Sequence, residues 1–233
     1  MRSMHPNPGS PSAGTARTHR YTSPGHAAAR WFAQRVLLKP LVWSLIGVRV
    51  RGRENVDSLQ APFIVVANHS SHLDAPLIMG ALPSRLTRHL AAGAAADYFF
   101  DVWWRKGLTA LFFNAFPIER TGLRGRPNMA PELLADGVPL LLFPEGTRSS
   151  DGTIARFKAG AAALCLSAEV PCVPIALVGA SEAMPRNRSW PVRGRPAVEV
   201  VIGEPIYAEK GESVRPLAQR IEARVRELYG NHT

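Results

Sequence analysis

Short, continuous runs of apolar residues recur along most of the chain and alternate with longer segments of helical character. A run of roughly five apolar residues is typical of a strand buried on both faces, because such a strand has no solvent-facing side. On this basis we predict strands at 63–67, 86–92, 116–118, 139–143, 173–178 and 197–202, and helices at 74–82, 97–113, 128–135, 159–168 and 213–229. The alternation predicts an α/β fold, a single domain with a mainly parallel central sheet flanked by helices.

The N-terminal 50 residues do not follow this pattern. Residues 1–28 are rich in Pro, Gly, Ser, Thr and Ala and offer little apolar surface to bury, so we predict a disordered basic tail. Residues 29–50 carry Trp and Leu interleaved with Arg and Lys. Their uncharged run, 41–48, is too short to span a bilayer, which takes about 20 apolar residues. The folded domain is therefore expected at residues 51–233.

The 29–50 segment has two interpretations. Its composition matches an amphipathic helix, or helices, lying in a membrane interface. The same pattern also fits an amphipathic helix that packs on the surface of the domain. Pro40 is expected to kink or split the element in either case, because proline removes a helical hydrogen bond and clashes with the preceding turn.

The net charge of +10 is concentrated at the N-terminus. Residues 1–53 contain nine of the 28 Lys and Arg and none of the 18 Asp and Glu, so the remaining residues hold 19 basic and 18 acidic groups. A basic segment on a neutral domain has two usual partners, nucleic acid and anionic membrane. The segment is rich in Trp and Leu and the chain carries no nucleic-acid-reading motif, so we expect a membrane surface and no nucleic acid.

One candidate for proton transfer lies where the predicted strand 63–67 gives way to the helix 74–82. His69 and Asp74 are five residues apart at this junction, where ligands of open α/β sheets bind. A neutral imidazole can accept a proton from a hydroxyl, and a carboxylate on its other nitrogen fixes the tautomer. Capping of the helix start is an equally good explanation of Asp74, and the two roles are compatible. His72 is a rival base with nothing obvious to orient it.

A second polar cluster follows the predicted strand 139–143. Gly146 permits close backbone approach, Thr147 offers a hydroxyl, and Arg148 offers a planar fork suited to phosphate oxygens. The spacing of a nucleotide-binding P-loop is absent. This cluster therefore indicates a site for an anionic group other than a P-loop nucleotide site.

Two further basic residues bear on the same site. Arg120 comes directly after the strand 116–118, and Lys158 lies in a loop ahead of a helix. For Lys158, solvation on the surface is as good an explanation as substrate binding. If the strand ends meet at one edge, a base, a carboxylate and several cations come together. That assembly suits action on a hydroxyl attached to an anionic group.

Four blocks, in order, resemble the glycerolipid acyltransferase family, which includes bacterial 1-acyl-glycerol-3-phosphate acyltransferases. Residues 68–74 match its NHxSxxD block, 117–120 its second block with a terminal Arg, and 143–149 its FPEGTRS block. Residues 170–175 resemble the fourth, with Cys172 where an aliphatic residue is more usual. The resemblance assigns residues 51–233 to an acyltransferase domain.

The resemblance implies that His69 is the general base and Asp74 its partner. The substrate-binding residues are then expected to be Ser71, Arg120, Glu145, Gly146, Thr147, Arg148 and Lys158. The implied reaction moves a fatty acyl group from an acyl thioester to the hydroxyl of a lysophospholipid, most simply 1-acyl-glycerol-3-phosphate, without an acyl-enzyme. Acyl-CoA and acyl carrier protein are both compatible donors, and no metal or other cofactor is required.

The expected location is the cytoplasmic face of a membrane, with peripheral or monotopic attachment. Two alternatives stay open at this point. The same chemistry could act on another lysolipid or a glycolipid, because the family's blocks are shared among such enzymes. The chain could also be a non-catalytic membrane lipid-binding protein, although both His69 and Asp74 are present.

Overall fold

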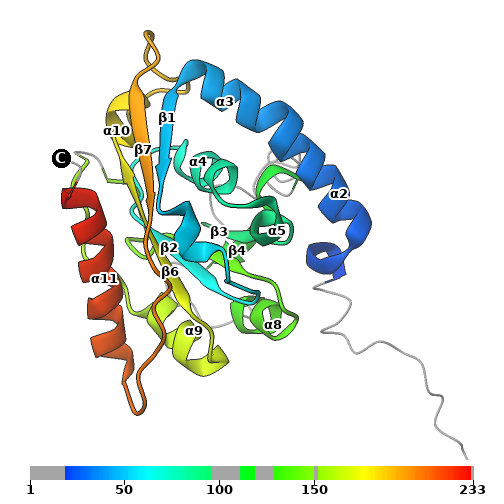
Figure 1. The fold of residues 1–233 in the computed structure, drawn as a ribbon, viewed down its shortest axis with the longest axis vertical. Helices are drawn as coiled ribbons and strands as arrows, with labels where there is room; N and C mark the ends of the chain where they lie inside the picture. Colours follow the sequence, from blue (N-terminus) through cyan, green and yellow to red (C-terminus); the bar gives the residue numbers. More distant parts are fainter. Residues whose placement is uncertain (1–18, 96–110, 119–128, 150–151, 232–233) are drawn as a thin grey trace, which may run out of the picture.

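The computed structural model describes residues 19–95, 111–118, 129–149 and 152–231. Within these ranges, seven strands form one sheet in the order β1-β7-β6-β2-β5-β3-β4 (Figure 1). The strands from β6 to β4 are parallel to one another, and β1 is parallel to β7, whereas β6 and β7 are antiparallel. The prediction of a single α/β domain with a mainly parallel sheet is confirmed.

The bounds of the elements are as follows. The strands are β1 Gly47–Arg51, β2 Ile64–Ala67, β3 Ala91–Ala95, β4 Phe116–Ile118, β5 Leu140–Leu142, β6 Cys172–Val178 and β7 Ala197–Ile202. The α-helices are α2 Pro24–Phe32, α3 Lys39–Leu45, α4 Asp74–Ala81, α5 Ser84–Thr87, α8 Met129–Ala135, α9 Gly160–Ala168, α10 Ala180–Ala183 and α11 Val214–Gly230. A π-helical segment, η1, covers Ala33–Leu38, and a 3₁₀ turn, η2, covers Arg53–Val56.

Strand β2 shows how the sheet separates two apolar layers. Successive side chains of a strand point to opposite faces. Val65 and Ala67 pack with α4 and α5, whereas Ile64 and Val66 pack with α8, α9 and α11 on the other face (Figure 1). All four side chains are fully buried, which explains why this strand reads as an unbroken apolar run.

The prediction of a disordered tail reaching residue 28 is wrong for its last ten residues, 19–28. Residues 19–22 are helical, and α2 begins at Pro24. Tyr21 is buried in the layer that contains α8 and α9, and the Arg20 guanidinium donates to the Ala115 carbonyl at 2.6 Å. One buried aromatic residue fixes this stretch to the domain, which its average composition does not reveal. Residues 1–18 lie outside the described residues.

The prediction that residues 29–50 are helical throughout is also corrected. Segments α2, η1 and α3 follow one another as one long helix, which continues through Pro40 (Figure 1). Residues 47–50 instead begin β1, an edge strand paired with β7, so the folded domain starts before residue 51. The alternation of Val48 and Val50 with Arg49 and Arg51 is the period-two signal of this strand.

The helix α2–η1–α3 turns polar side chains toward the domain. The Arg35 guanidinium donates to the Leu82 carbonyl and the Lys39 ammonium to the Gly80 carbonyl, both at 2.8 Å, while the Gln34 amide donates to the Phe112 carbonyl. The bonds of Arg35 and Lys39 satisfy carbonyls at the end of α4. The side chains that stay exposed are large and apolar, with 47–53% of each accessible: Trp31, Phe32, Val36, Leu37 and Leu41.

No helix in the described part of the chain is both long and apolar enough to cross a membrane. The hydrogen bonds and exposures of the helix α2–η1–α3 show that its polar face is bound to the domain and its apolar face points outward. We refer to the exposed residues Trp31, Phe32, Val36, Leu37 and Leu41 as the apolar row.

The predicted strand 86–92 is displaced in the structure. Residues 84–87 form α5, and strand β3 starts only at Ala91. Pro83 precedes Ser84 and supplies the fixed backbone angle that favours a helix start. The predicted helix 97–113 lies mostly outside the described residues, although residues 111–113 are helical. The remaining predicted strands and helices are found within one or two residues of their expected bounds.

One edge of the sheet collects the ends of several elements. Strands β2, β5 and β6 are parallel, so their carboxyl ends meet there. Because β7 is antiparallel to β6 and parallel to β1, both β7 and β1 begin at this same edge. The connection from β6 to β7 and the end of α3 therefore lie along the edge that receives His69.

Candidate active site

The turn after β2 is fixed by an asparagine that extends the strand pairing. The Asn68 side-chain oxygen accepts from the Leu177 N–H at 2.8 Å, and its amide donates to the Leu177 carbonyl at 2.9 Å. The pair continues the β2–β6 ladder through a side chain, so the main chain is free to turn away from the sheet. His69 is the first residue of that turn.

His69 and Asp74 form a hydrogen-bonded pair. The imidazole Nδ1 lies 2.7 Å from the Asp74 Oδ2. The carboxylate is fully buried, whereas 22% of the His69 side chain is exposed. Since Nδ1 is engaged, Nε2 is the nitrogen left to meet a substrate. An imidazole held in this way can take a proton at Nε2 while the carboxylate stabilises the resulting cation.

The same Asp74 oxygen also closes the turn. Oδ2 accepts from the Ser70 N–H at 2.7 Å and from the Ser71 N–H at 2.9 Å. The expectation that Asp74 caps helix α4 is corrected, because these donors precede the helix and no side-chain cap bond is found at its start in the described structure. The carboxylate orders the turn that carries His69 and binds the imidazole directly.

Phe143 is a neighbour of the base that the sequence pattern did not single out. Its ring stacks on the His69 imidazole with 4.1 Å between centroids and 18° between planes. An imidazole between a buried carboxylate and a flat aromatic ring has little freedom to rotate. Two signals were available: Phe143 ends the predicted strand 139–143, and it is the first residue of the block at 143–149.

Glu145 plays a different part from the phosphate-binding role predicted for it. The carboxyl is buried, and its Oε1 accepts from the His69 N–H at 2.6 Å while Oε2 accepts from the Ala155 N–H at 2.9 Å. Burial raises the pKa of Glu145, and the two backbone hydrogen bonds oppose that rise. A buried acceptor of N–H groups joins three loops and is unsuited to bind an anion. The Ser149 N–H adds a second link, donating to the His69 carbonyl at 2.8 Å.

We expect Glu145→Gln to destabilise the site without removing any catalytic group. The amide keeps one acceptor oxygen but turns an NH₂ group toward a backbone N–H that needs an acceptor. Leaving one buried donor unsatisfied costs about 1–3 kcal/mol. Urea unfolding should show this loss, and Glu182→Gln on the exposed part of α10 is the matched control. Equal stability of the two variants would contradict the role of Glu145 as a clamp.

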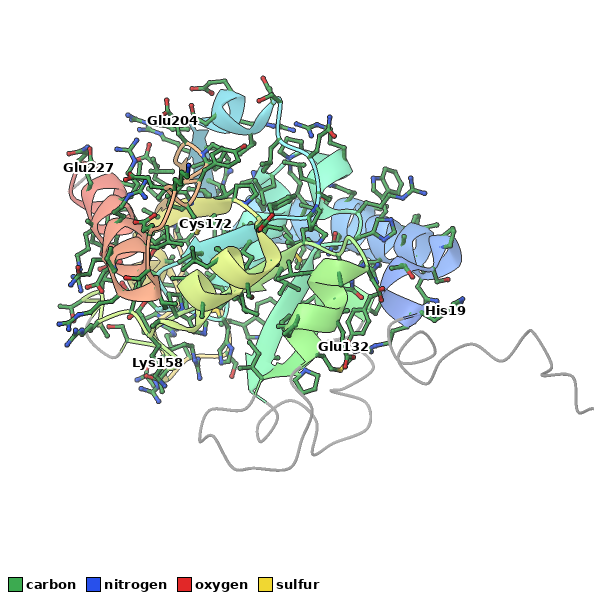
Figure 2. The ribbon with its side chains drawn as sticks, turned by 90° about the horizontal axis from the view of Figure 1, so that it is seen from below. His19, Glu132, Lys158, Cys172, Glu204 and Glu227 are labelled. Carbon is green, nitrogen blue, oxygen red and sulfur yellow. The ribbon has the colours of Figure 1, made fainter. Side chains whose placement is uncertain are left out.

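Three further predicted site residues of the 143–149 loop are partly or fully exposed. Gly146 has φ +79°, and a Cβ at this position would lie 2.7 Å from the Lys158 Nζ, so the lysine crosses directly over the glycine. Lys158 is exposed at the edge of the molecule in Figure 2. Thr147 is exposed, and Arg148 is half-buried close enough to His72 to lower the pKa of that imidazole. A hydroxyl and two cations therefore lie on or beside the loop that is bonded to the main chain of His69.

Of the other predicted site residues, Ser71 does not join this group. Ser71 is fully buried, its hydroxyl donating to the Met184 carbonyl at 2.9 Å and accepting from the Leu73 N–H, so it stabilises the turn. Arg120 lies outside the described residues.

The rival base His72 has a lowered pKa. Desolvation is the first cause, followed by the charges of Arg148 and His69. The carboxylate oxygen that would orient a base is bonded to His69 instead.

The comparison with protein families decides the assignment. The family model described as "Acyltransferase" matches residues 47–178, which include the His69–Asp74 turn and the 143–149 loop. The chain belongs to the acyltransferase family. The match begins at Gly47, the first residue of β1.

Named relatives of this acyltransferase-family chain share one description. A chloroplastic 1-acyl-sn-glycerol-3-phosphate acyltransferase from Brassica napus is 30% identical over 166 residues, covering 70% of this chain and 46% of the relative. The alpha form from Bos taurus is 32% identical over 182 residues, covering 76% and 60%. This chain thus spans roughly half the length of these curated relatives.

A solved structure agrees with the fold. The crystal structure of the 1-acyl-sn-glycerophosphate (LPA) acyltransferase PlsC from Thermotoga maritima matches with a TM-score of 0.62 and 29% identity. The match covers 91% of this acyltransferase-family chain and 90% of that one. Among the described residues, no group of three or more His, Cys, Asp or Glu side chains is placed to hold a metal ion.

Proposed function

We propose that this protein transfers a fatty acyl group from an acyl thioester to the free hydroxyl of a lysophospholipid, 1-acyl-glycerol-3-phosphate in the first place, to give phosphatidate. The observation that carries the proposal is the bond of 2.7 Å between His69 and the buried Asp74, next to a loop that holds Arg148 and is crossed by Lys158. The shared description of the relatives supports the choice of acceptor.

The proposed reaction is a single displacement. His69 Nε2 accepts the proton of the acceptor hydroxyl, whose oxygen attacks the thioester carbonyl carbon. The new ester C–O bond forms, the C–S bond breaks, and the imidazolium returns its proton to the departing thiolate. Asp74 stabilises the imidazolium between these two transfers, so no acyl-enzyme is needed.

The acceptor phosphate is proposed to lie against the 143–149 loop. Arg148 supplies a planar guanidinium, which binds phosphate oxygens in pairs, and Lys158 supplies a point charge beside Gly146. Thr147 offers an exposed hydroxyl donor. We keep Arg120 as a proposed third cation. A phosphate held here would place the glycerol hydroxyl next to the His69 imidazole.

For Arg148→Ala we expect weaker binding of lysophosphatidate. A hydrogen bond to a charged group contributes about 1.5–3 kcal/mol, which corresponds to a rise in acceptor KM of roughly 10- to 100-fold. The KM for the acyl donor should change far less. Arg215→Ala is the matched control, because Arg215 is exposed at the start of α11, near the opposite edge of the sheet. An acceptor KM equal to that of the control would exclude Arg148 as the phosphate ligand.

A panel of donors and acceptors tests the reaction itself. Purified protein is mixed with acyl-CoA or acyl carrier protein thioesters and with lysophosphatidate, other lysophospholipids, a lyso-aminolipid or a glycolipid, and thiol release is followed. We expect the fastest release with lysophosphatidate. Release that needs no acceptor would indicate hydrolysis, and no release with any pair would refute the proposal.

We further propose that the enzyme works as a peripheral or monotopic protein at the cytoplasmic face of a membrane. The support is the apolar row, whose side chains are about half exposed although their helix is bonded to the domain through its polar face. Exposed apolar surface of this extent is typical of contact with lipid or protein. The acceptor and product of the proposed reaction are themselves membrane lipids.

Substitution within the apolar row tests this contact. We expect Trp31→Ala to weaken binding to phospholipid vesicles by roughly tenfold, since partial burial of a large aromatic side chain contributes about 1.5 kcal/mol. Tyr207→Ala, which removes an aromatic residue with 62% exposure near the opposite edge of the sheet, should bind as the unaltered protein does. Truncating residues 1–50 is a poorer test, because it also removes most of β1. Flotation with vesicles measures both variants.

A further inference from the structure

The connection from β6 to β7 carries a group of exposed cations. Residues 185–195, which we call the 185–195 loop, contain four arginines and no Asp or Glu. All four arginines, Arg186, Arg188, Arg193 and Arg195, are exposed. Trp190, between the two pairs, is 63% exposed, the highest value among the large apolar side chains in the described part of the chain.

The base of the loop is firmly held while its middle projects. The Val192 N–H donates to the Ala183 carbonyl at 2.8 Å, and the Arg188 N–H to the Pro185 carbonyl at 2.9 Å. Residues 186–190, between these points, are all exposed. Trp190 therefore occupies a solvent-facing position in a loop whose base is hydrogen-bonded to the domain, and it contributes nothing to the core.

The loop bridges the catalytic turn and the end of the long N-terminal helix. Met184, just before it, accepts from the buried Ser71 hydroxyl, and the Arg186 guanidinium donates to the Arg148 carbonyl at 3.2 Å. At the other end, the Arg195 guanidinium donates to the Trp43 carbonyl in α3 at 3.2 Å. In Figure 1 the loop stands at the top of the molecule beside the end of α3.

The charge of the loop is not used within the described structure. No ion pair between any of its four arginines and a described carboxylate is found, in contrast to Arg220, Arg224 and Arg226 on α11. Exposed arginines that form no ion pair with a described carboxylate, grouped around an exposed indole, are complementary to a surface that is anionic outside and apolar just beneath.

We propose that the 185–195 loop is a second membrane contact, in which Arg188 and Arg193 bind anionic phospholipid headgroups and Trp190 enters the interface. The inference extends the proposed function, because it names the lipid class and a contact separate from the apolar row. Together with α3, the loop would hold the mouth of the active site against the lipid surface. Arg195 is bonded to Trp43, and Trp43 lies on the same long helix as the apolar row. The loop and the apolar row are therefore neighbouring surfaces, which favours a membrane over another partner.

Vesicle binding without any acyl substrate tests the loop independently of the reaction. The full chain, Arg188→Gln/Arg193→Gln and Trp190→Ala are floated with vesicles of phosphatidylcholine alone and with phosphatidylglycerol added. Each cation near an anionic surface contributes about fivefold to binding, so the double variant should lose roughly 30-fold on anionic vesicles and little on neutral ones. Trp190→Ala should lose roughly tenfold on both.

Matched controls remove the same groups near the opposite edge of the sheet. Lys210→Gln/Arg215→Gln removes two exposed charges, and Tyr207→Ala removes one exposed aromatic ring. Both should bind as the unaltered chain does. An equal loss in the charge control would assign the effect to net charge, an equal loss in Tyr207→Ala would assign it to any exposed ring, and either would overturn the proposal.

Two other results would also overturn it. If the loop variants bind vesicles normally but lose turnover with acyl carrier protein alone, the loop serves an acidic donor protein. If they lose binding to a nucleic acid duplex and keep vesicle binding, the partner is nucleic acid. Absence of acyl transfer with normal vesicle binding would instead refute the proposed function and leave the loop assignment standing.

Discussion

Replacement of His69 by alanine is expected to lower kcat by at least about 100-fold, because the variant has no group to accept the proton of the acceptor hydroxyl. The KM values for donor and acceptor should change little, since neither the 143–149 loop nor its bonds to the main chain of residue 69 depend on the imidazole. Thiol release under saturating substrates measures the effect.

Two controls make this result specific to the base. The His72→Ala variant removes the neighbouring imidazole, which is hydrogen-bonded to no carboxylate of the described residues, and should retain far more activity than His69→Ala. Added imidazole should restore part of the lost rate to His69→Ala, because a partly exposed ring leaves an accessible space. Full activity of His69→Ala, or equal losses in both variants, would remove His69 as the general base.

The second large effect is expected at Asp74. In Asp74→Asn the amide oxygen can still accept from the Ser70 and Ser71 N–H groups, which keeps the turn folded. That oxygen also still faces the His69 Nδ1, but the neutral amide cannot stabilise an imidazolium as a carboxylate does, so kcat should fall by roughly 10³-fold or more. Circular dichroism and unfolding curves near those of the unaltered protein would show that the loss is chemical.

Comparison with Asp74→Ala separates the two roles of the carboxylate. Alanine leaves two buried backbone donors without their acceptor, at a cost of about 1–3 kcal/mol for each buried group. We therefore expect Asp74→Ala to lose both stability and activity, and Asp74→Asn to lose mainly activity. If the asparagine variant is as unstable as the alanine variant, Asp74 is chiefly structural.

Most of the sheet could be predicted from the apolar runs, since a strand buried on both faces leaves a plain signal. Strand β4 and helix α8 are found at their predicted positions. Strand β1 could not be separated from the preceding helix, since Val48 and Val50 continue its apolar texture. The period-two alternation with Arg49 and Arg51 extends over only five residues.

The parts of the candidate site that depend on residue type could be predicted from the sequence. The parts that depend on the direction in which a side chain points could not. The pairing of His69 with Asp74 follows from their spacing across a turn. Glu145 lies in the loop that is predicted to bind phosphate. Its carboxyl instead points inward and accepts from two backbone N–H groups, and no pattern of residue types reveals that direction. Ser71 is predicted to bind substrate because it belongs to the block at residues 68–74. Its side chain has no exposed surface, so its hydroxyl can bond only to the protein.

In the N-terminal helix α2–η1–α3, charged side chains face the domain and large apolar side chains face solvent. Its arginines and lysine were expected to face an anionic partner, and Arg35 and Lys39 instead bond the carbonyls at the end of α4. Burial lowers the pKa of both cations, in agreement with a desolvated position. Helical periodicity locates two faces but does not say which one meets the domain.

The double attachment of His69 to the 143–149 loop has a consequence for engineering. The main-chain N–H of His69 is bound by Glu145 and its carbonyl by the Ser149 N–H, so the two segments move as one body. A chimera that takes one segment from a relative and leaves the other native risks shifting the base by the mismatch between parents. Grafts intended to change acceptor preference should therefore exchange residues 68–74 and 143–149 as a single cassette.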